Sequence, residues 1–420
     1  MAKLITLEGG LKVYYLRRQA SESFALGVFV GAGAHYERGK NNGVAHFIEH
    51  MVFKGTEKRS AFDIANETDA CGLSVNAYTG KQYTAFYTIG LIEYREKCAD
   101  ILSDLFFNPT FTEENMEKEK GVVLEEIHMY EDDAEDLCLE NLTLAHYGKG
   151  RLSQPILGPE RNVKKFDRTI IDDFRKQFYR LDNTCIAIVG NLSEKEAVDL
   201  VKKYFPAQKY AEKYRRPVLR VCAPRAQYAE KIKPFEQASV GISFPTYSQK
   251  DPRHNVSTFV SNILGGSMSS RLFQDVREDA GLVYEIYFSH NQYYNNAHAY
   301  VYFATAPERV EEALRRVRAC LLKAASEGFT QEEFDKTMAQ LKTSVALSSD
   351  SVSSLMRLGG HQAFLGKAYS AEKAIRELEK VTLKDINDAL PELLDLTKSS
   401  LSYVGKKQNF NLMGVLRGDL

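Results

Sequence analysis

Residues 43–53 of the chain read Gly-Val-Ala-His-Phe-Ile-Glu-His-Met-Val-Phe, and the interpretation of the whole sequence starts from this stretch. On a helix, His46 and His50 are four residues apart, so both imidazoles project from one face, about one turn apart. Two nitrogen ligands at this spacing can bind a single zinc ion. Glu49 precedes the second histidine, where a carboxylate can take a proton from water beside the metal.

The pattern H-x-x-E-H is the reversed form of a zinc-protease motif and predicts a metallopeptidase. Two histidines on one helix face are, taken alone, more often structural than metal-binding. The neighbours favour the metal, because a helix that is apolar almost all round is expected to be buried. Burying unpaired polar side chains costs roughly several kcal/mol, and a metal ion would provide a partner for both histidines and the glutamate of the motif. The apolar neighbours are Val44, Phe47, Ile48, Met51, Val52 and Phe53.

The composition is that of an ordinary globular protein. At 420 residues the chain is long enough for two or more domains. A formal net charge of -1 gives no support for a nucleic-acid or polyanion partner. No apolar run is long enough for a transmembrane helix, and residues 1–10 lack the apolar core of a signal peptide. We therefore expect no membrane association, and we expect the N-terminus to enter the fold as a strand.

The six cysteines are scattered singly, with no C-x-x-C pair. This usage is neither a disulfide framework nor a cysteine zinc site. It favours a reducing, cytoplasmic location.

The same order of elements occurs twice along the chain. An apolar strand at 24–30, a loop and the His46 helix are followed in the second half by a strand at 238–244, a loop and a helix at 254–264. Each half ends in a strand that closes on glycine, at 185–190 and 400–405. The sequence predicts an α+β fold of two duplicated domains, 1–210 and 211–420, each an antiparallel sheet packed with helices. The Lys-, Arg- and Tyr-rich stretch 206–233 is expected to be a linker.

A catalytic zinc site needs a third protein ligand, and the best candidate lies on a predicted helix at 113–131. At about 100° per residue, Glu119, Glu126 and Tyr130 fall within roughly 40° of one another, flanked by Val122 and Val123, while Glu125 falls on the polar side. A carboxylate on the core-facing side needs a partner. This makes Glu126 the leading third ligand, with an internal salt bridge as the alternative, and Glu119 a candidate outer-shell carboxylate.

These residues resemble the pitrilysin/insulinase family of zinc peptidases, especially the branch that includes the mitochondrial processing peptidase. In that family a ligand glutamate follows the motif at about the distance seen here, 126 − 50 = 76 residues. The flanking stretches 31–38, 51–56 and 119–127 are also similar. The resemblance implies that His46, His50 and Glu126 bind Zn²⁺, that Glu49 is the general base, and that Glu119 is an accessory acid.

Two further stretches resemble substrate-binding elements of the family. Residues 74–79 are similar to its edge strand, which implies that Asn76 and Ala77 bind the substrate backbone. An exposed edge can add an extended peptide as another strand, although a plain hairpin edge is the alternative. Residues 270–284 are similar to its Arg/Tyr element, with the spacing 284 − 277 = 7. This implies that Arg277 and Tyr284 hold the substrate and stabilise the oxyanion.

The second half lacks its own H-x-x-E-H, so we expect one zinc per chain. Family members of this length form two-chain clams enclosing a chamber, which implies a peptidase acting on unfolded peptides. Because this chain has both the zinc set and the Arg/Tyr set, a homodimer is favoured, and a heterodimer is possible. Two alternatives are a precursor- or leader-peptide maturation protease that needs a partner, and a non-catalytic scaffold subunit of the same fold.

Overall fold

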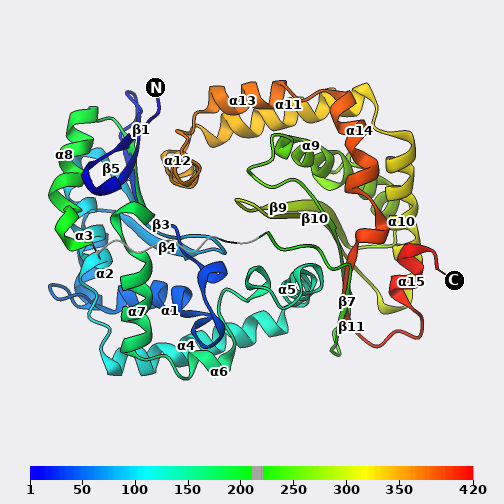
Figure 1. Ribbon diagram of the computed structural model, residues 1–420, viewed down its shortest axis with the longest axis horizontal. Coiled ribbons are helices and arrows are strands. Elements are labelled where there is room, and N and C mark those ends of the chain that lie inside the picture. The colour runs from blue at the N-terminus through cyan, green and yellow to red at the C-terminus, as the bar shows by residue number, and fades with distance from the viewer. Residues whose placement is uncertain (211–218, 220, 420) are drawn as a thin grey trace. The chain divides into compact units, whose positions relative to one another are not determined.

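The computed structural model describes residues 1–210, 219 and 221–419 (Figure 1). The chain forms two compact units: Met1–Ile127, Gln154–Val218 and Val345–Ala374 make the first, and His128–Ser153, Leu219–Ser344 and Ile375–Leu420 the second. The predicted domain boundary after residue 210 borders residues 211–218, which lie outside the described part, and it stays a prediction. The first unit thus includes Val345–Ala374 from the second half of the sequence, and the second unit includes His128–Ser153 from the first half.

The first unit contains a six-stranded sheet in the order β1-β2-β6-β3-β5-β4. All neighbours pair antiparallel except β2 and β6, which are parallel. The central strands β3 and β6 are almost wholly buried, and β4 forms an edge. The strands are β1 Lys3–Thr6, β2 Lys12–Arg17, β3 Ser23–Val30, β4 Ser74–Thr79, β5 Thr84–Leu91 and β6 Thr184–Gly190.

The second unit contains a five-stranded sheet in the order β7-β11-β8-β10-β9, which repeats β2-β6-β3-β5-β4 strand for strand. The parallel pair recurs as well, between β7 and β11. This confirms the duplication and the α+β class, and adds one parallel pair to each predicted antiparallel sheet. The strands are β7 Tyr228–Ile232, β8 Ala238–Pro245, β9 Glu285–Gln292, β10 Ala297–Thr305 and β11 Ser400–Gly405.

The linker prediction was wrong at its end, because β7 lies within 206–233. As an edge strand, β7 pairs through its backbone with β11 and keeps most of its side chains exposed, so its sequence carries little apolar pattern. The earlier part of that prediction, at 211–218 and 220, lies outside the described residues.

The helices predicted at 113–131 and 254–264 are confirmed to within about two residues at their ends. The helices of the described residues are, in chain order, α1 Val44–Met51, α2 Ala61–Ala70, α3 Arg95–Phe107, α4 Glu113–Asp132, α5 Ala134–Tyr147, α6 Glu160–Val163, α7 Arg168–Phe178, α8 Glu194–Tyr204, α9 His254–Gly265, α10 Val310–Glu327, α11 Gln331–Ser348, α12 Val352–Phe364, α13 Ala371–Glu379, α14 Leu383–Leu393 and α15 Leu412–Arg417. No helix among the described residues is both long and apolar enough to span a membrane. None of the six cysteines, all of which lie in the described part of the chain, forms a disulfide.

The two faces of the first sheet are covered by helices from different parts of the chain. Helix α12 packs on β2, β3 and β6, where Phe29, Ala85 and Met356 belong to one buried cluster. The next residue along β5, Phe86, faces the other way and contacts Phe106 of α3. Helix α1 contacts β4 and β5 on this same face. The candidate metal helix and α12 therefore lie on opposite faces of one sheet.

Candidate metal centre

The start of α1 is fixed by a buried carboxylate. Glu37 accepts hydrogen bonds from the Ala45 N–H at 2.8 Å, the Gly43 N–H at 2.7 Å and the Asn42 side-chain amide at 2.8 Å. Gly43 has a φ of 101°, and a Cβ there would lie 2.4 Å from the Leu157 carbonyl oxygen, so only glycine fits. Burial raises the pKa of Glu37 to about 7, and the three donors oppose the rise. These contacts position the helix that carries both histidines.

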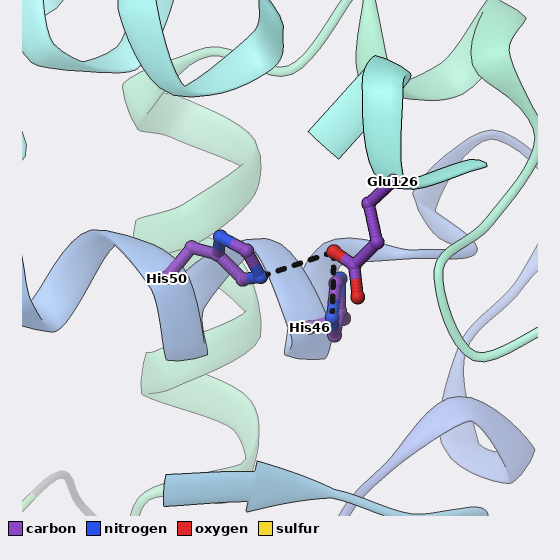
Figure 2. Close-up of side chains that lie close together, drawn as sticks. All are labelled: His46, His50 and Glu126. Carbon is purple, nitrogen blue, oxygen red and sulfur yellow. Dashed lines mark ion pairs between the residues drawn. The ribbon is translucent and has the colours of Figure 1, made fainter. Parts of the chain in front are cut away.

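The three predicted ligands converge on one point (Figure 2). Glu126 Oε2 lies 3.3 Å from His50 Nε2 and 3.6 Å from His46 Nε2, and the three ligand atoms lie within 4.8 Å of one another. Ligands about 2.0–2.1 Å from a tetrahedral zinc ion are themselves about 3.3–3.4 Å apart. Glu126 Oε2 is buried and has no hydrogen-bond partner among the described residues. The donor set and its spacing therefore fit zinc.

The charge states also suit metal binding. Burial and the neighbouring His50 lower the pKa of His46 to about 4, so its imidazole is neutral near pH 7. The neighbouring His50 ring holds the pKa of Glu126 below its usual value despite partial burial. A neutral imidazole and an ionised carboxylate are the forms that bind a metal ion.

Glu119 lies behind His50, as predicted for an outer-shell carboxylate. Its Oε1 lies 2.9 Å from His50 Nδ1, and its Oε2 pairs with Lys54 Nζ at 2.7 Å. A proton on Nδ1 donated to Glu119 leaves the Nε2 lone pair free to face the metal position. Glu119 is only 3% exposed, and each of its oxygens has a partner.

The helical-wheel argument was correct for the carboxylates and wrong for two neighbours. Glu125 is exposed, and Glu126 pairs with the two histidines. Val122 and Tyr130, expected on the core-facing side, are 50% and 42% exposed. The buried stripe of α4 is narrower than predicted and is formed by Met116, Glu119, Val123 and Ile127.

Glu49 lies on α1 beside the ligand set. Burial raises the pKa of its carboxyl above the usual value, while contacts with Thr79 and the charge of His50 oppose the rise. Its Oε2 is buried and has no hydrogen-bond partner among the described residues. The carboxylate is therefore held close to the ligands with one oxygen free to accept a proton.

The edge strand β4 presents its backbone next to Glu49. The Gly80 N–H donates to the Tyr83 carbonyl at 2.8 Å. Because antiparallel ladders alternate, Ala77 and Thr79 direct their backbone groups to the free edge. Asn76 Oδ1 accepts a hydrogen bond from the Ala77 N–H at 2.8 Å, which covers this group locally. The edge predicted from Asn76 and Ala77 is thus present.

Arg277 and Tyr284 belong to the second unit. Arg277 lies in η9, Phe273–Asp279, an irregular helical turn, with its guanidinium 4.7 Å from the Phe273 ring centroid. Tyr284 is 63% exposed just before β9. Both can donate hydrogen bonds, and their role in catalysis stays a prediction.

Comparisons with known proteins establish the family. Residues 12–160 match the family described as insulinase (peptidase family M16), and residues 165–341 match the family described as peptidase M16 inactive domain. The uncharacterised zinc protease YmxG of Bacillus subtilis is 35% identical over 394 residues, which is 94% of this chain and 96% of that protein. The chain belongs to the M16 peptidase family.

Further M16 proteins agree with this assignment. An uncharacterised zinc protease of Mycobacterium tuberculosis is 32% identical, covering 93% of this chain and 90% of its own length. A crystal structure of a peptidase M16 inactive domain from Pseudomonas fluorescens has a TM-score of 0.90 at 20% identity, covering 98% of this chain and 99% of its own. A protease from Helicobacter pylori has a TM-score of 0.89 at 18% identity, covering 96% of this chain and 99% of its own. At these identities the structures support the M16 fold alone.

Three residues of the site were not predicted from the sequence: Glu37, Lys54 and Thr79. Glu37 and Lys54 lie in the stretches that flank the motif and carry the family resemblance. Thr79 lies at the end of the predicted edge strand, but its nearness to Glu49 depends on how α1 packs on β4.

Proposed function

We propose that this M16 protein is a zinc-dependent endopeptidase that hydrolyses unfolded peptides, with His46, His50 and Glu126 as metal ligands. The observation that carries the proposal is the convergence of the ligand atoms of His46, His50 and Glu126 beside the Glu49 carboxylate. When bound there, zinc would lower the pKa of water and polarise the peptide carbonyl. The contact between His50 Nδ1 and Glu119 supports this arrangement, because a proton donated to Glu119 would leave Nε2 free to bind the metal.

The chain's own residues supply the proton transfers and the substrate contacts. Glu49 takes the proton of the attacking water and delivers it to the leaving amine. Burial raises the pKa of the Glu49 carboxyl, which makes it a stronger base than an exposed glutamate. The peptide adds to β4 as a further strand, on the edge-facing backbone groups of Ala77 and Thr79, and it displaces the Asn76 side chain from the Ala77 N–H. Arg277 and Tyr284 are the proposed oxyanion donors.

The decisive experiment compares wild type with Glu49→Gln and uses Glu125→Gln as the matched control, since Glu125 is exposed on α4. Zinc content and cleavage of a quenched fluorogenic peptide library are measured on all three. We expect about one zinc per chain throughout, with cleavage lost only in Glu49→Gln. If wild type binds no zinc and remains inactive after zinc is added, the enzyme proposal fails and the scaffold alternative stands.

We further propose a homodimer, in which the zinc set of one chain acts with the Arg277/Tyr284 set of its partner. The family resemblance supports this, because one chain carries both sets. Mixing inactive Glu49→Gln and Arg277→Ala chains then restores activity, up to about a quarter of wild type, since half the dimers are mixed and one of their two sites is intact. No recovery from chains shown to exchange subunits would contradict this assembly. A requirement for a second protein would indicate the maturation protease.

A further inference from the structure

An open pocket lies on the α12 face of the first sheet, beside the free edge of β4. Its volume is 410 Å³. All of its lining residues belong to the first unit. They are Tyr78 from β4, Ser348 from α11, and Ser354, Arg357, Leu358 and His361 from α12.

The side chains in the wall of this pocket contact one another. The Tyr78 hydroxyl is hydrogen bonded to His361 Nε2 at 2.8 Å. The Tyr83 ring packs on the His361 ring with centroids 4.0 Å apart, and Phe29 meets its edge at 5.6 Å. The edge strand β4 therefore contacts α12 through these side chains.

Arg357 provides the charge in this pocket. It is exposed, and no carboxylate pairs with it in the part of the chain that the structure describes. The hydroxyl groups of Ser348 and Ser354 line the same pocket and can also donate hydrogen bonds. An arginine with neighbouring hydroxyls is suited to binding a carboxylate.

The strand register determines which side chain of a bound peptide would face this pocket. When a peptide pairs with β4, the residue opposite Tyr78 has its side chain on the same face as Tyr78. Tyr78 points to α12, whereas Thr79, the next residue, lies near Glu49 on the α1 face. One peptide side chain therefore points toward the Arg357 pocket, and its two neighbours point to the opposite face.

We infer that Arg357 determines substrate specificity by binding an acidic side chain at one position of a peptide added to β4. This inference rests on the proposed peptidase function. It predicts that the preference falls on a single peptide position and is absent at the positions directly before and after it.

The test uses fluorogenic peptides that differ only by Glu or Gln at one position, scanned along the sequence. The ratio of kcat/KM for Glu over Gln is measured for wild type, Arg357→Gln, Arg357→Lys and Lys367→Gln. Lys367 is exposed just after α12 and does not line the pocket, so this control removes the same charge nearby. Binding of the same peptides is measured separately by fluorescence anisotropy.

We expect wild type and Lys367→Gln to prefer Glu about fivefold at one position, through KM and binding. The preference should be lost in Arg357→Gln and partly kept in Arg357→Lys. A wild type without preference at any position, or a preference that persists in Arg357→Gln, overturns the inference. If wild type cleaves no peptide, the proposed function fails, and the anisotropy ratios still decide whether Arg357 binds the acidic side chain.

Discussion

Replacing Glu119 tests how much of the metal affinity depends on residues behind the ligands. The carboxylate is buried and pairs with His50 at 2.9 Å and with Lys54 at 2.7 Å. A hydrogen bond to a charged group contributes about 1.5–3 kcal/mol, and a neutral acceptor about half as much. We therefore expect zinc to bind about 10- to 100-fold more weakly in Glu119→Ala and about 3- to 10-fold more weakly in Glu119→Gln.

The assay is competition for zinc between each metal-free protein and a chromogenic chelator at pH 7.5. Glu125→Gln removes an exposed carboxylate from the same helix and should bind zinc like wild type. The thermal midpoints of the metal-free proteins separate a loss of affinity from a loss of folding. If Glu119→Ala binds zinc as tightly as Glu125→Gln, or if Gln weakens binding more than Ala, the outer-shell role is wrong.

Three further predictions concern stability. Burial raises the pKa of Asp104, but hydrogen bonds from Thr56, Asn108 and Arg59 lower it by more, so the net shift is downward. The contribution of Asp104 to stability is therefore present above about pH 4 and lost at lower pH. The difference in thermal midpoint between wild type and Asp104→Asn should shrink from pH 6 to pH 3, and a constant difference would contradict these contacts. Gly359→Ala should destabilise the protein by about 1–3 kcal/mol in urea titration, because its Cβ would lie 2.0 Å from the Tyr14 ring; unchanged stability would show that α12 can move away. Chelating zinc should lower the thermal midpoint of wild type but not of Glu126→Gln. Zinc binding stabilises the native state by about 4 kcal/mol when the free zinc concentration is a thousandfold above Kd. Equal shifts in the two proteins would show that the chelator acts elsewhere.

The parts of the site that the sequence predicted are those set by local periodicity. The spacing of His46 and His50 and the position of Glu126 on α4 follow from helix geometry, and they come together as expected. Glu37 could not be identified by periodicity, because it acts from a loop and its partners are backbone groups. The only indication of a role for Glu37 in the sequence was its position in the stretch 31–38, which is similar to the family.

The exchange of segments between the two units could not be predicted from the sequence, for a different reason. Helix α12 belongs by sequence to the second half, yet its Met356 packs near Gly27 and its Gly359 against Tyr14. These contacts join residues far apart in the chain, and an amphipathic helix does not indicate which sheet it covers. The Arg357 pocket depends on this packing, so the sequence alone gave no reason to select that arginine.

The internal repeat accounts for the finding that, among the described residues, the candidate metal ligands belong to one half of the sequence. Phe111-Thr112-Glu113-Glu114 at the start of α4 corresponds to Phe329-Thr330-Gln331-Glu332 at the start of α11, an offset of 329 − 111 = 218 residues. With that offset, Glu119 corresponds to Thr337 and Glu126 to Ser344. Thr337 is buried and lies 3.3 Å from the amide oxygen of Asn262 on α9, much as Glu119 lies against His50 on α1. The repeat thus keeps a buried polar contact between the equivalent helices in both units. In the second unit that contact is neutral, and the ligand position has only a hydroxyl. The expected stoichiometry of one zinc per chain follows from these replacements, because serine and threonine hydroxyls are not among the usual protein ligands of zinc.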